Sequence, residues 1–170
     1  MNDRIATLLQ GRRDRMTRVL GRPLAEPQAD DSPLPDRARQ HLLSEGRDLY
    51  WNELEWENLM EEEAVDVGEP LIELMFPGLL AFIRGLLLTR VMDDALAPAR
   101  PRPVVVEDLL RFLTGRLVEL EEKMEAASGE EVEPLRSEVK MTDRLVDLVL
   151  YLYHGLTEGD VERLETAGQP

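Results

Sequence analysis

Apolar residues recur at helical spacing along almost the whole chain, and no segment alternates cleanly enough to predict a strand. Glycine and proline separate the periodic segments, as expected for helix ends. The predicted helices cover about 3–20, about 36–65, a unit from 68 to 91 that breaks near Pro77, 103–128, 131–154 and a short terminal helix over 157–166. We therefore expect an all-α fold, a single helical bundle of about five helices with an N-terminal helical arm.

Three segments differ in composition and define the expected organisation of the chain. Residues 1–22 read as a basic amphipathic helical arm, in which arginines surround one apolar stripe. Residues 23–35 hold four prolines, which mark a linker, and residues 36–167 form the acidic helical bundle. Within that bundle, apolar residues lie almost all round the helix over 79–91, which predicts a helix near the centre.

Charge and composition exclude several classes of function. The chain has 35 acidic and 20 basic residues, a net charge of −15, which argues against general binding to nucleic acid or anionic membranes. It has no cysteine, which removes disulfides, thiol nucleophiles and thiolate metal sites and fits a cytoplasmic protein. The apolar stretch 71–92 contains Pro77 and Arg84, so we interpret it as a buried helix rather than a membrane span.

A junction between acidic and apolar sequence marks the first candidate site. Residues 45–73 hold eleven acids against one arginine, and Glu53 and Glu57 lie one turn apart on the inward arc of their helix. A buried carboxylate must be paired, protonated or bound to metal. One hypothesis is a Mg²⁺ or Mn²⁺ site. The other, which we favour, is a buried polar network in which Arg116, and similarly placed Arg90, pair with these glutamates, with no metal and no cofactor.

Histidine placement limits metal and acid–base chemistry. Ferritin-like carboxylate proteins need a glutamate three residues before a histidine. The residues at that position before His41 and His154 are Ala38 and Tyr151, so that motif is absent. His154 ends the predicted helix over 131–154, where the helix dipole favours a cation.

The second candidate site is a surface for another protein. Trp51 lies opposite the inward arc of the second helix, beside acidic residues, and Trp is enriched at binding hot spots. The arginine-rich first helix is the other candidate, although we favour the alternative in which it folds back onto the acidic second helix of its own chain or of a symmetric mate. The residues predicted to contact a partner are Trp51, Glu55, Glu62, Arg12, Arg13 and Arg15.

These observations predict a non-enzymatic cytoplasmic protein–protein interaction module, an adaptor or assembly factor. It would bind through the acidic helix, the arginine-rich helix or both. The expected partner is another protein or a second copy in a homodimer, and we expect no nucleic acid and no membrane. No motif names a reaction. Two alternatives remain open: a Mg²⁺-dependent all-α phosphohydrolase using carboxylates on the bundle helices, and an acidic inhibitor that mimics nucleic acid.

Overall fold

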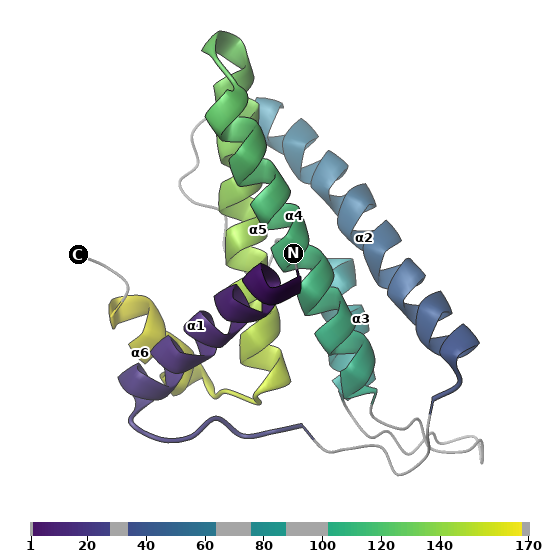
Figure 1. The fold of residues 1–170 in the computed structure, drawn as a ribbon, viewed down its shortest axis with the longest axis vertical. Helices are drawn as coiled ribbons and strands as arrows, with labels where there is room; N and C mark the ends of the chain where they lie inside the picture. The colour runs from purple at the N-terminus through teal and green to yellow at the C-terminus, as the bar shows by residue number, and fades with distance from the viewer. Residues whose placement is uncertain (1, 28–33, 64–75, 88–101, 168–170) are drawn as a thin grey trace.

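The computed structural model describes residues 2–27, 34–63, 76–87 and 102–167, and for 2–3 and 56–63 it describes the helix backbone only (Figure 1). This part of the chain is helical throughout apart from its connections, which confirms the all-α prediction. None of its helices is long and apolar enough to cross a membrane. The helices are α1 (Asn2–Leu20), α2 (Asp36–Glu63), α3 (Pro77–Leu87), α4 (Pro103–Ala126), α5 (Val132–Tyr153) and α6 (Glu158–Ala167), with a 3-10 turn over Gly129–Glu131.

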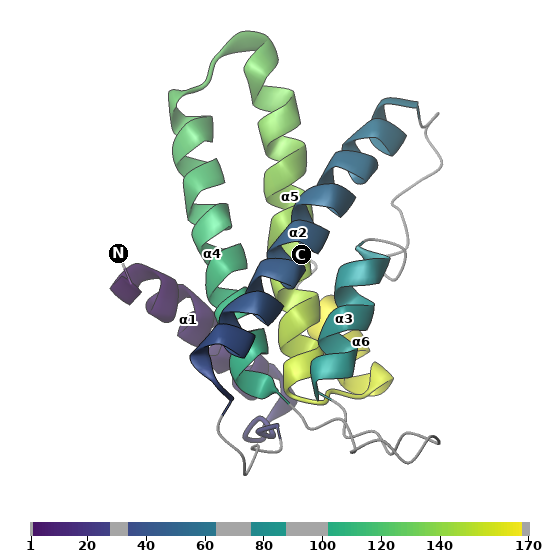
Figure 2. The same cartoon turned by 90° about the vertical axis from the view of Figure 1, so that its right-hand side faces the viewer.

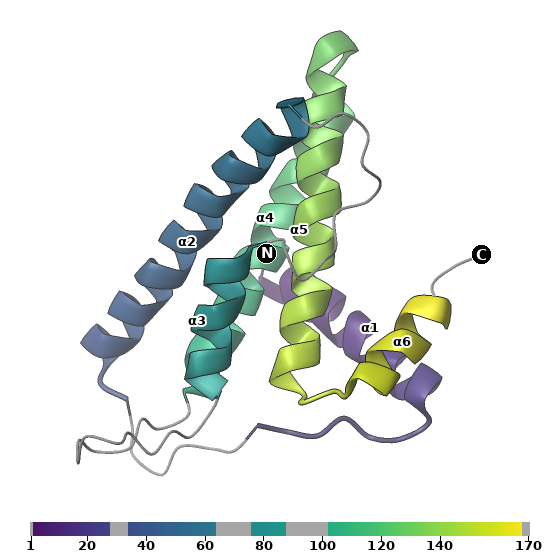
Figure 3. The same cartoon turned by 180° about the vertical axis from the view of Figure 1, so that it is seen from behind.

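Helices α4 and α5 form a long antiparallel hairpin that supports the other four helices (Figure 1). Helices α2 and α3 pack against one side of this hairpin and against each other (Figure 2). Helix α1 lies across α4 on the other side and continues into contact with α6, as the view from behind also shows (Figure 3). The hairpin is therefore the only element in the described part of the chain that contacts both sides of the bundle.

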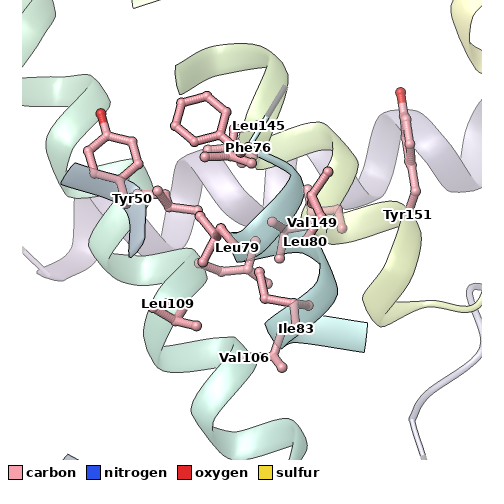
Figure 4. Close-up of a cluster of buried hydrophobic side chains, with 14 of the residues drawn as sticks. Tyr50, Phe76, Leu79, Leu80, Ile83, Val106, Leu109, Leu145, Val149 and Tyr151 are labelled. Carbon is pink, nitrogen blue, oxygen red and sulfur yellow. The ribbon is translucent and has the colours of Figure 1, made fainter. Parts of the chain in front are cut away.

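The core lies where α2, α3, α4 and α5 meet, and Figure 4 shows its centre. Tyr50 of α2 is fully buried, stacks on Phe76 with 5.7 Å between ring centroids, and shares a hydrogen bond of 2.8 Å with the hydroxyl of Thr142. That bond satisfies both hydroxyls, whose burial without a partner would be costly. The apolar side chains that belong to the same cluster as Tyr50 come from α3 (Leu79, Ile83), α4 (Val106, Leu109) and α5 (Leu145, Val149).

Helix α3 is not the central helix that its apolar pattern predicts. Its Leu79, Leu80, Ile83 and Leu86 are buried, but Arg84 is exposed, so α3 covers one face of the hairpin. The pattern is misleading because α3 also carries apolar residues beside its buried face. Two of them, Phe82 and Leu87, are only partly buried. The rest of the predicted helix, including Arg90, lies outside the described residues.

Helix α1 packs on different neighbours from those expected. It buries Leu9, Met16 and Leu20 against the hairpin and α6, whereas the alternative that we favoured from sequence placed it on the acidic α2. Acidic residues also occur on α4, α5 and α6, and those that pair with the α1 arginines belong to α4 and α5. Charge alone therefore did not identify the helix on which α1 packs.

Candidate interaction face on α2 and α4

Glu53 caps the start of α3. Its two carboxylate oxygens accept hydrogen bonds from the backbone N–H groups of Gly78, at 2.5 Å, and Leu79, at 2.9 Å. These groups belong to the first turn of α3, where N–H donors have no partner within the helix and negative charge is favoured. A Cβ atom at Gly78 would lie 2.7 Å from the Glu53 carboxylate, so glycine is needed for this approach.

Arg116 does not join Glu53 in a buried network. Its guanidinium pairs with Glu138 at 3.2 Å and with Glu119 at 3.5 Å, and its Cζ lies 4.8 Å from the centre of the Trp51 ring. The predicted Arg116–Glu53 pair fails because Glu53 faces α3, whereas Arg116 faces α5 and the outer edge of α2. Within the predicted network, the side chain of Glu57 and all of Arg90 lie outside the described residues.

Trp51 is the centre of a partly exposed aromatic cluster on α2 and α4. The Trp51 side chain is 43% exposed, yet its ring contacts Tyr50 edge-on at 5.1 Å and Phe112 at 6.4 Å between centroids. A second guanidinium, that of Arg47, lies 5.6 Å from the centre of the Phe112 ring. Guanidinium groups stabilise aromatic faces at such distances. We call Trp51, Phe112, Arg47, Arg116 and exposed Glu55 the Trp51 face.

The phenol of Tyr50 supports this face from below. Burial raises the pKa of Tyr50, which keeps the phenol neutral and lets it share its hydrogen bond with Thr142. Tyr50 is thereby fixed between the core and the Trp51 ring, and the exposed tryptophan rests on a rigid base. The sequence placed Trp51 outward on α2, but Phe112 lay in the apolar stripe of its own helix and gave no sign of forming part of a surface.

The arginines of α1 that we predicted to bind a partner instead bind their own chain. Arg12 pairs with Asp143 and, at 2.6 Å, with Asp147. Arg13 pairs with Glu107 at 2.7 Å. Arg15 donates a hydrogen bond of 3.1 Å to the carbonyl of Leu164. Most of the predicted basic surface therefore lies against α4, α5 and α6. The side chain of Glu62, also predicted to contact a partner, lies outside the described residues.

His154 is neutral rather than the cation that its place at the end of α5 predicted. Its ring is buried, Nε2 accepts a hydrogen bond of 2.9 Å from Arg13 Nε, and Nδ1 lies 2.7 Å from the carbonyl of Ala25. Because arginine can only donate, Nε2 must be unprotonated and Nδ1 carries the proton. Burial lowers the pKa of His154, and the adjacent Arg13 acts in the same direction.

In the described part of the chain, no three His, Asp or Glu side chains are placed to hold a metal ion. No protein-family model, no curated protein and no solved structure matches the chain. A rigid aromatic group with stacked arginines and flanking carboxylates is suited to contact with another protein surface.

Proposed function

We propose that this protein is a non-enzymatic interaction module of the cytoplasm, an adaptor or assembly factor, which binds another protein or a second copy of itself through the Trp51 face. The observation that carries the proposal is Trp51, 43% exposed while its ring is held between Phe112 and Arg116. Trp and Arg are the residue types most enriched at binding hot spots. The lack of cysteine supports the cytoplasmic assignment.

The rigidity of the face favours binding. An exposed side chain that must be ordered on association costs about 0.5–1.5 kcal/mol of conformational freedom. Contacts with Tyr50 and Phe112 already restrict the Trp51 ring in the free protein. The Trp51 ring therefore loses less conformational freedom when a partner covers it.

Two of the other hypotheses from the sequence, a metal site at Glu53 and binding through the arginine-rich helix, have less support from the described residues. Both oxygens of Glu53 are occupied by backbone N–H groups of α3, so this carboxylate has a structural role without a metal ion. Binding of a partner through the arginine-rich α1 is less well supported, because Arg12 and Arg13 pair with acidic residues of their own chain. The α2–α4 side therefore remains the better supported binding surface.

Site-specific photo-crosslinking tests this function. A photoreactive phenylalanine analogue at Ser44, which is exposed on the same side of α2 as Trp51, should form a defined covalent adduct in the cells that make the protein. The yield of the adduct should fall about thirty-fold when Trp51 is replaced by alanine, the effect expected of a hot-spot residue. The measurement is the mass and yield of the adduct.

The matched control places the same photoreactive group at Glu162, which is exposed on α6, away from the Trp51 face. It should give no adduct of that mass. Equal adducts from both positions, or an adduct from Ser44 that survives Trp51→Ala, would contradict binding through this face. Circular dichroism of each variant confirms that the helices remain folded.

A further inference from the structure

The charges on α2 are arranged symmetrically about Trp51. Arg47 lies four residues before Trp51 and Glu55 four residues after it, and all three side chains are exposed. Four residues are slightly more than one helical turn, so the three side chains share one side of α2, with the charged groups roughly 6 Å to either side of the tryptophan along the axis.

This spacing is self-complementary under a twofold rotation. Two identical helices can pack antiparallel about a twofold axis. A residue that lies n positions before the axis in one copy then meets the residue n positions after the axis in the other copy. With the axis at Trp51, Arg47 of each copy faces the partner's Glu55. Two opposite-charge pairs then flank two tryptophan rings that pack against each other.

Two further exposed positions on this side of α2 are compatible with such packing. Gln40 and Ser44 are exposed on the same stripe, and both are uncharged. Phe112 and Arg116 of α4 lie beside Trp51 and widen the contact beyond a single helix. Arg47 is already oriented along the surface by its contact with the Phe112 ring.

We infer that the Trp51 face binds a second copy of this chain, forming an isologous dimer in which α2 packs antiparallel to α2 with Trp51 at the twofold axis. This inference rests on the proposed function of the same face and names its partner. The self-complementary order of charges is the reason to choose a second copy over a different protein, because an unrelated partner would not require opposite charges at equal distances from Trp51.

A charge-reversal experiment tests the dimer directly. Arg47→Glu places two glutamates opposite each other at both contacts, and Glu55→Arg places two arginines there. Each variant alone should weaken the dimer about tenfold or more, measured by sedimentation equilibrium. The double variant Arg47→Glu/Glu55→Arg should regain the dimer, because the two pairs are then exchanged rather than lost.

An equimolar mixture of the two single variants should also form dimers, since every contact in the mixed species is again between opposite charges. The matched controls are Arg18→Glu on α1 and Glu125→Arg on α4, which change the net charge equally at exposed positions away from the face. They should leave the dimer unchanged. Trp51→Ala should abolish it.

Two results would overturn the dimer. One is a wild-type protein that stays monomeric up to about 1 mM. The other is a mixture of single variants that associates no better than either alone. If the protein is monomeric but the photo-crosslink from Ser44 captures a different protein, the dimer is refuted and the proposed function stands. If the crosslink also fails, both are refuted.

Discussion

Glu53 and Glu55 lie two positions apart on α2, and their surroundings give them different roles. Glu53 points at α3 and accepts two backbone hydrogen bonds, whereas Glu55 is exposed. The helical period predicted which of the two faces inward. It did not predict the partner of Glu53, because the N–H groups that it accepts belong to a helix start 25 residues further along. Phe76, with φ of 51°, turns the chain into that position.

Replacing Glu53 by glutamine tests its role as a cap. Glutamine has one acceptor oxygen where the carboxylate has two, so Gly78 or Leu79 loses a partner. The free energy of unfolding should fall by about 1 kcal/mol, as for the loss of other helix caps. Urea denaturation measures this change, and Glu55→Gln, at an exposed position, should leave the value nearly unaltered.

Thermal melting curves of wild type and Glu53→Gln, with and without millimolar Mg²⁺ or Mn²⁺, distinguish the cap from the metal hypothesis. If Glu53 acts only as a helix cap, neither ion should change the melting temperature. A rise in the wild-type melting temperature that disappears in Glu53→Gln would instead show that the folded protein binds the ion through this carboxylate, because a ligand of the folded state alone stabilises it.

At the scale of elements, Gly46 determines how closely α2 approaches α4. A Cβ atom at Gly46 would lie 2.6 Å and 2.8 Å from the two methyl groups of Leu109, a buried side chain. Gly46→Ala should therefore reduce stability, because overpacking costs about 1–3 kcal/mol and outweighs the gain of about 1 kcal/mol in helix propensity. Thermal or urea unfolding measures the net effect.

Gly11 is the matched control within α1. No atom would lie within 4 Å of a Cβ there, and the residue is exposed. Gly11→Ala should stabilise the protein by about 0.5–1 kcal/mol through helix propensity alone. If both substitutions stabilise the protein equally, α2 and α4 are not packed as closely as the structure places them.

Element boundaries followed from the sequence, whereas contacts between elements did not. Pro103 begins α4 and Gly155 follows α5, as predicted, because proline and glycine act on the local backbone. The predicted start of α6 near Thr157 is confirmed: Thr157 and Asp160 exchange backbone-to-side-chain hydrogen bonds of 3.1 Å. Helical periodicity identifies a buried face but not the helix that covers it, so the partner of Arg116 was not predicted.

At the scale of the whole molecule, the N-terminal segment is joined to helices far along the chain. Arg12 pairs with α5 and Arg13 with α4, while Arg22 pairs with Asp160 of α6 at 2.6 Å. The hydrogen bond between Arg22 and Asp160 lowers the pKa of that carboxyl group. In a chain with a net charge of −15, a basic α1 reduces repulsion among the acids that it contacts.

Titration of His154 links the stability of these contacts to pH near neutrality. Its pKa is lowered from 6.5 by burial, so below about pH 6.5 the unfolded chain binds a proton that the folded protein excludes. The contribution of neutral His154 to the free energy of unfolding is therefore fully present above that pH. It is lost as the pH drops, by at most about 1.4 kcal/mol per pH unit. Protonation would also remove the acceptor of Arg13 and place two cations 2.9 Å apart.

We expect His154→Gln to flatten the dependence of unfolding free energy on pH between about 7 and 5.5, because glutamine retains an acceptor and a donor but does not titrate. His41→Gln is the control, since that ring is 73% exposed. Urea unfolding across the pH series gives the slopes. Identical slopes for wild type and His154→Gln would show that His154 does not couple protonation to the docking of α1, and carboxyl groups would then account for any loss of stability in acid.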